Sequence, residues 1–290
     1  MPNPTRGRTQ PSSPIKGRTQ PSSPIKGGAK TPSWFLLLET EPRCAAENMA
    51  RDEYLFRLCH ESRCGFLRIY SWARPTFSTG VSQKAAKALN LDFIKANGCD
   101  YVRRITGGKT VLHDHEITYA VASSEDLFFK EHDLHQSYLL ISRVLVRALR
   151  SLDVEAVLSQ GSSSELSRSH NPCFSFPTPN EIEVNGRKII GSAQKRDKQA
   201  LLQHGSIPLT MNYDHYAAGA NFSSELIARN MTTWSDISAR SRQDLTAALV
   251  QSFKFFIGCD FFPLNFNQED QRQIADLTEK YSSDAWNLVL

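Results

Sequence analysis

The chain of 290 residues is 40% hydrophobic and 22% charged with a formal net charge of +4, as expected of a globular protein with a substantial core. No apolar run approaches the roughly 18 residues of a membrane span, and the opening MPNPTRGRTQ lacks the apolar segment of a secretory signal. We therefore expect a cytoplasmic protein without a membrane span.

The positive charge belongs to the first segment of the chain. Residues 1–33 contain six lysines and arginines and no acid, which leaves 28 cations against 30 anions in residues 34–290. Because phosphate groups are bound by clustered cations, we expect no nucleic-acid partner for the slightly acidic remainder.

The same segment contains a tandem repeat. The ten residues GRTQPSSPIK occur at 7–16 and again at 17–26. A sequence so rich in Pro and Ser cannot bury enough apolar surface to offset its ordering entropy. We predict a disordered basic tail at 1–33, with a docking or nucleic-acid-binding arm as the alternative, followed by one folded domain at 34–290.

Hydrophobic periodicity predicts the elements of that domain. The predicted strands are 34–38, 66–70, 101–105, 117–122, 154–158, 181–184, 187–194 and 200–209. The predicted helices are 45–60, 89–96, 134–152 with Asp133 as N-cap, about 241–257 and about 268–281, and 159–171 is predicted to be a mobile loop. Glu53 falls on the apolar stripe of the first helix and therefore needs a partner. Because strands lead and helices close the chain, we expect an α+β fold with a mixed or antiparallel sheet and flanking helices.

The six cysteines are dispersed and include no C-x-x-C pair. This pattern predicts reduced thiols and no metal site. Cys59 and Cys259 lie in helical patterns and are expected in the core, whereas the pattern around Cys99 leaves its role open.

A first candidate site segment runs from the end of a predicted strand into a glycine turn. It contains Arg103, Arg104, Gly107, Gly108 and Lys109. Backbone N–H groups and cations in such a turn can hold a carboxylate, a phosphate or an oxyanion. The alternative is a hairpin turn flanked by surface charges.

A second segment follows the dipeptide Asn-Gly at 185–186, which favours a two-residue hairpin. That register places Lys188 opposite Glu183, so one interpretation is a cross-strand ion pair of little energetic value. The other places the Lys188 ammonium over a reacting carbonyl. The small residues Gly191, Ser192 and Ala193 would then leave room for an acyl chain.

Cys173, in the loop between Pro172 and Pro177, is the candidate nucleophile. A thiol beside a lysine ammonium ionises at lower pH, which makes it reactive at neutral pH. His113 and His204 lie close to these segments in the sequence. Each is either structural or orients a carbonyl or an incoming amine.

Taken together, these motifs resemble the lipoate–protein ligase and octanoyltransferase superfamily, whose catalytic domain is shared with biotin–protein ligase. The similar segments are 46–53, 67–72, 103–108, 187–193, 204–206 and 279–287. The resemblance implies that residues 34–290 form a catalytic domain of the biotin/lipoate protein ligase type.

Three enzyme classes share this resemblance. ATP-dependent lipoate ligases have a third glycine where this chain has Lys109. Cysteine-dependent octanoyltransferases have their nucleophile fifteen residues before the motif lysine, the separation of Cys173 and Lys188. A further class moves the acyl group between lipoyl domains. The resemblance favours the octanoyltransferase and leaves the other two, and a non-catalytic binding module, as alternatives.

The resemblance also implies a mechanism and partners. Cys173 would accept an octanoyl group from acyl carrier protein, while Lys188 would lower the pKa of the thiol and stabilise the tetrahedral oxygen. A lipoyl-domain lysine would then receive the acyl group. The implied substrate-binding residues are Arg103, Arg104, Gly107, Gly108, Lys109, His113, Gly191, Ser192, Ala193 and His204. We expect a monomer without metal or cofactor, ATP and Mg²⁺ being needed only by the ligase alternative.

Overall fold

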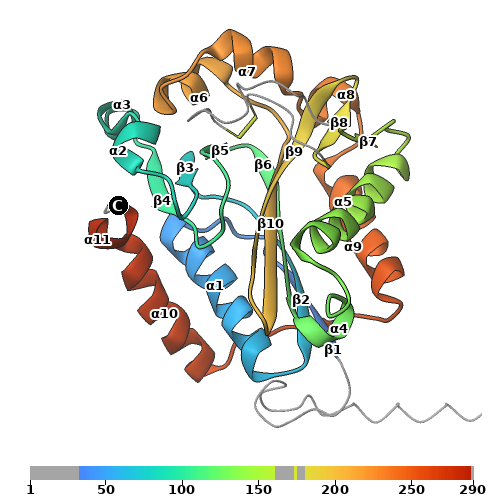
Figure 1. Ribbon diagram of the computed structural model, residues 1–290. Helices are drawn as coiled ribbons and strands as arrows, with labels where there is room; N and C mark the ends of the chain where they lie inside the picture. Colours follow the sequence, from blue (N-terminus) through green and yellow to red (C-terminus); the bar gives the residue numbers. More distant parts are fainter. Residues whose placement is uncertain (1–32, 161–172, 175–179, 289–290) are drawn as a thin grey trace, which may run out of the picture.

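The computed structural model describes residues 33–160, 173–174 and 180–288 (Figure 1). The strands are β1 (Ser33–Leu38), β2 (Cys64–Tyr70), β3 (Thr76–Thr79), β4 (Asp100–Arg103), β5 (Val111–His113), β6 (Glu116–Ser124), β7 (Val157–Leu158), β8 (Ile182–Val184), β9 (Arg187–Arg196), β10 (Ala200–Pro208) and β11 (Phe262–Pro263). The helices are α1 (Ala45–Glu61), α2 (Ala85–Ala88), α3 (Leu91–Ala96), α4 (Glu125–Phe128), α5 (Leu134–Arg150), α6 (Tyr213–Gly219), α7 (Ser224–Asn230), α8 (Trp234–Ile237), α9 (Arg242–Ile257), α10 (Gln268–Ser282) and α11 (Asp284–Asn287). The predicted tail and most of the predicted loop at 159–171 lie outside the described residues.

The strands form two mixed sheets. The larger has the order β11-β1-β2-β6-β10-β9-β8-β7, in which β1 is parallel to both of its neighbours and the other pairs are antiparallel. The smaller has the order β4-β3-β5, with one parallel and one antiparallel pair. The predicted α+β fold with a mixed sheet and flanking helices is therefore confirmed.

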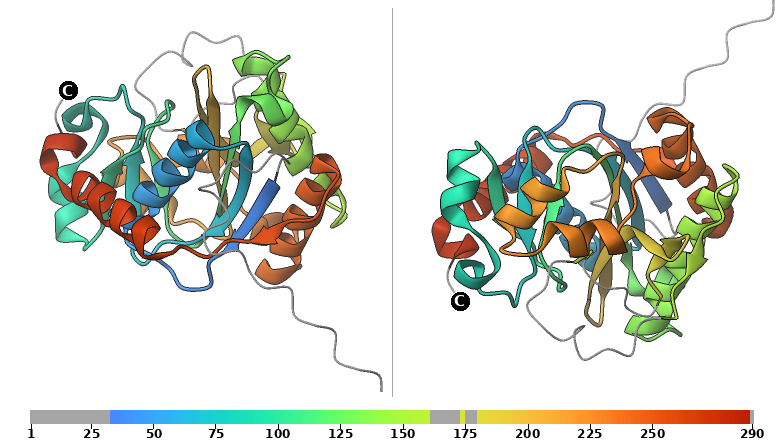
Figure 2. Two further views of the ribbon diagram at one scale, coloured as in Figure 1. Left: turned by 90° about the horizontal axis from the view of Figure 1, so that it is seen from below. Right: turned by 90° about the horizontal axis from the view of Figure 1, so that it is seen from above.

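Helices cover both faces of the large sheet. Helices α1 and α10 lie on one side, and α5 and α9 lie on the other (Figures 1 and 2). Every residue of β2, β6 and β10 is consequently buried. A strand covered on both faces is expected to be apolar on both rather than alternating. These three strands depart from that pattern at buried polar residues such as Arg68, Glu116 and His204.

The small sheet builds a separate core with α2, α3, α6 and α7. Phe77 lies within this core, and the fully buried Phe174 packs into it beside Cys173. The candidate nucleophile thus lies where the small sheet meets β9 of the large one.

Several predicted elements differ from the observed ones. Strand β7 is only two residues long because Val154 packs into the core outside the sheet. Helix α9 ends at Ile257, and Gly258 takes a φ of 73° as its C-cap. Cys259 therefore lies beyond the helix and is exposed, so its predicted burial is wrong, whereas the buried Cys59 is confirmed.

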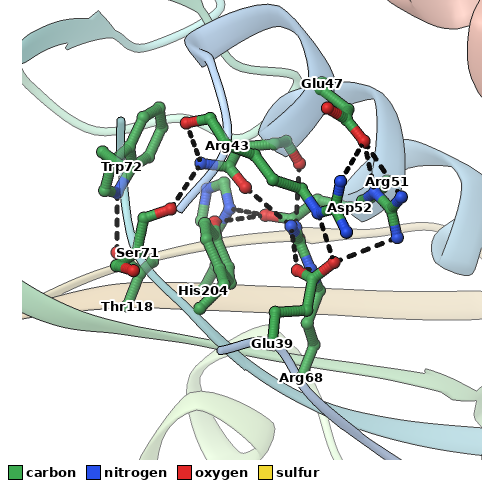
Figure 3. A network of polar contacts seen from close by, with 12 residues as sticks. Glu39, Arg43, Glu47, Arg51, Asp52, Arg68, Ser71, Trp72, Thr118 and His204 are labelled. Atoms are coloured by element: carbon green, nitrogen blue, oxygen red, sulfur yellow. Dashed lines mark hydrogen bonds and ion pairs between the residues drawn. The ribbon is translucent and has the colours of Figure 1, made fainter. Parts of the chain in front are cut away.

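A buried arginine joins the large sheet to α1 (Figure 3). The guanidinium of Arg68, in the middle of β2, donates to Asp52 at 2.7 Å, Glu39 at 2.6 Å and the side chain of Asn48 at 2.7 Å. It also lies 3.7 Å from the ring centroid of Tyr70. Burial would raise the pKa of Asp52, but Arg68 and His204 lower it overall, so Asp52 is ionised at neutral pH.

Glu53 finds the partner that its place on the apolar stripe requires. Its carboxylate accepts hydrogen bonds from Lys280 at 2.7 Å, from Tyr281 at 2.5 Å and from Arg57 at 2.5 Å. Because Lys280 and Tyr281 belong to α10, these contacts attach α10 to α1.

We expect Arg68→Met to lower the free energy of unfolding by about 3–5 kcal/mol, because the buried Asp52 loses its arginine partner and Glu39 loses one of three. Urea denaturation would measure the loss. Arg57→Met, which removes a 56% exposed arginine from a carboxylate that keeps Lys280, is the control and should cost less than about 1 kcal/mol. Equal effects of the two substitutions would contradict the structural role given to Arg68.

Candidate active site

Cys173 and Lys188 lie side by side. The backbone N–H of Cys173 donates to the carbonyl of Thr110 at 2.8 Å, which holds the residue against the small sheet. The Nζ of Lys188, from β9, is 3.3 Å from the Sγ of Cys173 and 2.9 Å from its carbonyl oxygen. The side chain of Lys188 is fully buried.

The third group at this site is Glu181, which the sequence analysis missed. The predicted register is correct, since Lys188 pairs with Glu183 in the hairpin, but the carboxylate that binds its ammonium is that of Glu181. Glu181 directly precedes β8, and a register shift lies between Ile182 and Glu183. The sequence signal that could have identified it was a second glutamate two residues before Glu183.

The surroundings of Lys188 keep it charged. Burial alone would lower the pKa of Lys188, but the charges of Cys173 and Glu181 raise it overall. Its ammonium has three N–H donors, and the carboxylate of Glu181, the carbonyl and the sulfur of Cys173 are their three acceptors. The cation is therefore fixed, and one of its N–H groups is directed at the sulfur.

A narrow cavity begins at Cys173. Its empty space is about 350 Å³, part of which is continuous with solvent. The predicted site residues that line it are Arg104, His113, Cys173, Gly191, Ser192, Ala193 and His204. The lining residues that were not predicted are Met49, Tyr70, Trp72, Ser78, Val111, Thr118, Gly205 and Ser206. Met49, Tyr70, Trp72, Gly205 and Ser206 belong to segments of the family resemblance, but no local pattern assigned them to the site. Ser78, Val111 and Thr118 lie outside those segments.

Gly191 makes room for the nucleophile. A Cβ atom at this position would lie 2.8 Å from the ring of Phe174 and 3.4 Å from the Sγ of Cys173. The neighbouring Ser192 shares a hydrogen bond of 2.8 Å with the hydroxyl of Tyr119. Small residues here thus allow Cys173 and Phe174 to approach the sheet closely.

The two predicted histidines are engaged within the cavity wall. The Nδ1 of His204 contacts Asp52 at 2.7 Å (Figure 3). Its Nε2 contacts Thr106 at 2.7 Å. Burial lowers the pKa of His204 although Asp52 opposes it, so the ring is neutral and Nδ1 donates to the carboxylate. His113 contacts Glu116 at 2.9 Å and stacks on Trp72 at 4.2 Å. Their roles toward a substrate stay predictions.

The glycine turn is held by Arg104. Its guanidinium donates to the carbonyls of Gly107 and Lys109, both at 2.8 Å, and burial lowers its pKa to about 10. Gly108 has a φ of 88°, which favours glycine, and a Cβ on it would lie 3.5 Å from that of Ala193. Arg104 thus shapes this turn beside the cavity.

Lys109 and Arg103 are placed differently from each other. Burial lowers the pKa of Lys109, while the charges of Cys173 and Glu181 oppose that shift, so Lys109 is a second cation near the nucleophile. The guanidinium of Arg103 instead donates to the carbonyl of Asn287 at 3.1 Å. Arg103 therefore binds the α11 segment and is not among the residues that line the cavity.

The sequence profile of the lipoyl protein ligase A/B catalytic domain matches residues 44–254. The chain belongs to this family.

Within the described residues, no group of three His, Cys, Asp or Glu side chains could hold a metal ion. No helix in the same part of the chain is long and apolar enough to cross a membrane.

Curated relatives of this family member are octanoyltransferases. Octanoyltransferase LipM of Brevibacillus brevis is 34% identical over 266 residues, which cover 86% of this chain and 96% of the relative. The LipM of an Exiguobacterium species is 36% identical over 268 residues with the same coverage. The predicted enzyme class, an acyltransferase that moves an octanoyl group, is confirmed by these relatives, and the ATP-dependent ligase is not favoured.

Solved structures of lipoate protein ligases share the fold. Lipoate-protein ligase A bound with ATP has a TM-score of 0.75 at 25% identity and covers 88% of this chain and 98% of its own. A bipartite lipoate protein ligase from Thermoplasma acidophilum, described with its E2 lipoyl domain, has a TM-score of 0.75 at 23% identity, with 89% and 98% covered. The predicted ligase-type fold is confirmed.

We expect Gly191→Ala to lower the free energy of unfolding by about 1–3 kcal/mol and to slow reactions of Cys173, because the new methyl group would overlap the buried ring of Phe174. Thermal unfolding and the rate of alkylation by iodoacetamide would measure both effects. Gly107→Ala is the control: its Cβ would meet no atom within 4 Å, so stability should change by less than about 0.5 kcal/mol. Matching losses in the two variants would contradict the packing argument.

Proposed function

We propose that this protein transfers an octanoyl group from acyl carrier protein to a lipoyl-domain lysine through a thioester on Cys173. The observation that carries the proposal is the 3.3 Å contact between the buried ammonium of Lys188 and the sulfur of Cys173 at the end of a narrow cavity. The octanoyltransferase relatives support the transferred group, and the E2 lipoyl domain named with the T. acidophilum ligase supports the acceptor. A cytoplasmic, monomeric enzyme without metal or cofactor belongs to the same proposal.

In the first half-reaction the thiolate of Cys173 attacks the carbonyl carbon of the octanoyl thioester. The C–S bond to the phosphopantetheine sulfur then breaks, and the ammonium of Lys188 gives a proton to the leaving thiolate. The thiolate charge is one of the causes that raise the pKa of Lys188. Because the new thioester is neutral, that cause disappears and Lys188 releases its proton more readily.

In the second half-reaction the amine of the acceptor lysine attacks the Cys173 thioester. An amide bond forms, the C–S bond breaks, and the neutral Lys188 takes the proton that the amine loses. The thiolate and ammonium are thereby restored, with Glu181 still bound to Lys188. No nucleotide is consumed because the donor is already a thioester.

The cavity suits an acyl chain because its polar groups bond to one another. His204 is bonded to Asp52 and Thr106, and Ser206 donates to Glu116 at 2.5 Å. Met49, Val111 and Ala193 contribute apolar wall. A hydrocarbon chain placed against these walls would therefore leave these buried polar groups paired.

We expect Cys173→Ala to abolish the octanoyl adduct and to lower the rate of transfer by at least about 10³-fold, because it removes the nucleophile. Mass spectrometry after mixing with octanoyl-acyl carrier protein would detect the adduct. Cys99→Ser, at a thiol outside the cavity lining, is the control and should form the adduct. Octanoyl-lipoyl domain and free octanoate with ATP complete the donor panel, and full transfer by Cys173→Ala would refute the proposal.

We expect Glu181→Gln to move the alkaline loss of activity to lower pH. Lys188 must be an ammonium in the resting enzyme, so activity is lost as pH rises through its pKa. Glu181→Gln removes one of the charges that raise the pKa of Lys188, so the opposing effect of burial is less fully offset and the pKa falls. The profile of kcat/KM between about pH 7 and pH 10 would show the shift. Glu183→Gln, which removes the carboxylate opposite Lys188 in the strand register, should leave the profile in place, and identical profiles for both variants would argue against Glu181.

A further inference from the structure

An arginine-lined groove lies on the outer face of α5. Arg143, Arg147 and Arg150 are exposed and follow one another at helical spacing. With Val146, Ser151 and Leu158 of β7 they line an open groove whose empty space is about 1130 Å³, including the part open to solvent. Helix α5 lies beside β7 at one edge of the large sheet (Figure 1).

The arginines of this groove have no ion-pair partner among the described residues. In the part of the chain that the structure describes, none of the three arginines forms an ion pair, and the nearby Asp153 pairs with Arg240 at 3.5 Å. The folded part of the chain is slightly acidic overall, so this cluster departs from its surroundings. Unpaired arginines in a groove are suited to an acidic partner.

The groove also has the composition of a contact surface. The guanidinium of Arg147 lies 3.8 Å from the ring centroid of Phe255, a side chain of α9 that is 67% exposed. Arginine and aromatic residues are enriched among the residues that dominate binding energy. The Nε of Arg150 donates to the carbonyl of Ala156 at 2.9 Å, which fixes the chain leading into β7.

A short chain of contacts connects this groove to the nucleophile. Leu158 lines the groove, and the N–H of the next residue, Ser159, donates to the carbonyl of Glu181 at 2.8 Å. The carboxylate of Glu181 binds Lys188, whose Nζ is 3.3 Å from the sulfur of Cys173. The groove is therefore close to Cys173 without touching it.

The separation between the groove and Cys173 suits one of the two protein substrates better than the other. The acceptor lysine has a stem of only four carbons, so its domain must lie directly against the opening at Cys173. The donor carries its thioester on a phosphopantetheine arm, which is several times longer and can bridge from a neighbouring surface. We propose that the groove formed by Arg143, Arg147, Arg150 and Leu158 docks an acidic surface of the acyl-donor carrier protein. The inference rests on the proposed function.

The experiment compares two donors that deliver the same group. Octanoyl-acyl carrier protein can use the groove, whereas octanoyl-pantetheine has no protein to dock. In the variant Arg143→Glu/Arg147→Glu we expect the KM for the carrier to rise on the order of tenfold, while acyl-adduct formation from octanoyl-pantetheine is unchanged. The difference should diminish as salt is added. Arg272→Glu, at a 76% exposed arginine of α10, is the control for reversing a surface charge elsewhere and should leave both donors unaffected.

The possible results separate the inference from the proposed function. Unchanged carrier kinetics in the double variant, or an equal loss with both donors, would overturn the docking surface. A loss confined to the step that consumes the lipoyl domain would assign the groove to the acceptor and would also overturn it. Wild-type protein that forms an adduct with neither donor would instead refute the proposed function.

Discussion

A buried ammonium held between a carboxylate and a sulfur is the interaction on which the site depends. Lys188 is fully enclosed by protein, where an isolated charge would be costly. Glu181 and Cys173 make the charged state favourable and fix its direction. Because the site is buried, the pKa of Lys188 also depends strongly on the charge on Cys173. The readiness of Lys188 to give up its proton therefore depends on whether Cys173 is charged.

The scaffold around this group also contains charge in its interior. Arg68 occupies the centre of β2, where the pattern of a doubly covered strand calls for an apolar residue, and its carboxylate partners come from α1 and the end of β1. Asp52 of that set also orients His204 in the cavity wall. The same network therefore attaches α1 to the sheet and provides hydrogen-bond partners for His204 in the wall of the cavity that contains Cys173.

Local signals predicted much of this fold. The Asn-Gly turn at 185–186 specifies a hairpin geometry by itself, and the register that follows from it is correct. Asp133 caps α5 as predicted because its capping box involves residues only three apart. Glu53 was expected to need a partner, but its contacts with α10 join residues more than 200 apart in the sequence, which no local pattern can identify.

The candidate site was predictable where it depends on spacing and was missed where it depends on tertiary contact. Cys173 and Lys188 meet, as the family resemblance that includes their fifteen-residue separation implied. Glu181 was missed because ideal alternation points to Glu183, and a register irregularity in β8 changes the partner. Strand β5 has three residues and α6 has seven, so neither is long enough to show clear periodicity. Arg103 binds Asn287 because α11 packs beside β4, an arrangement set by the whole chain.

Cys173, the proposed nucleophile, and Lys188, the cation beside it, are anchored to different sheets. Cys173 is tethered through Thr110 to the edge of the small sheet, whereas Lys188 is part of the large one. The sulfur-to-nitrogen spacing is thus set by how rigidly two separate cores are joined. A partner or substitution that shifts one core by a fraction of an ångström would change the distance between Cys173 and Lys188, and with it the reactivity of the thiol, without contacting either side chain. The contact between the two sheets is therefore where reactivity could be regulated.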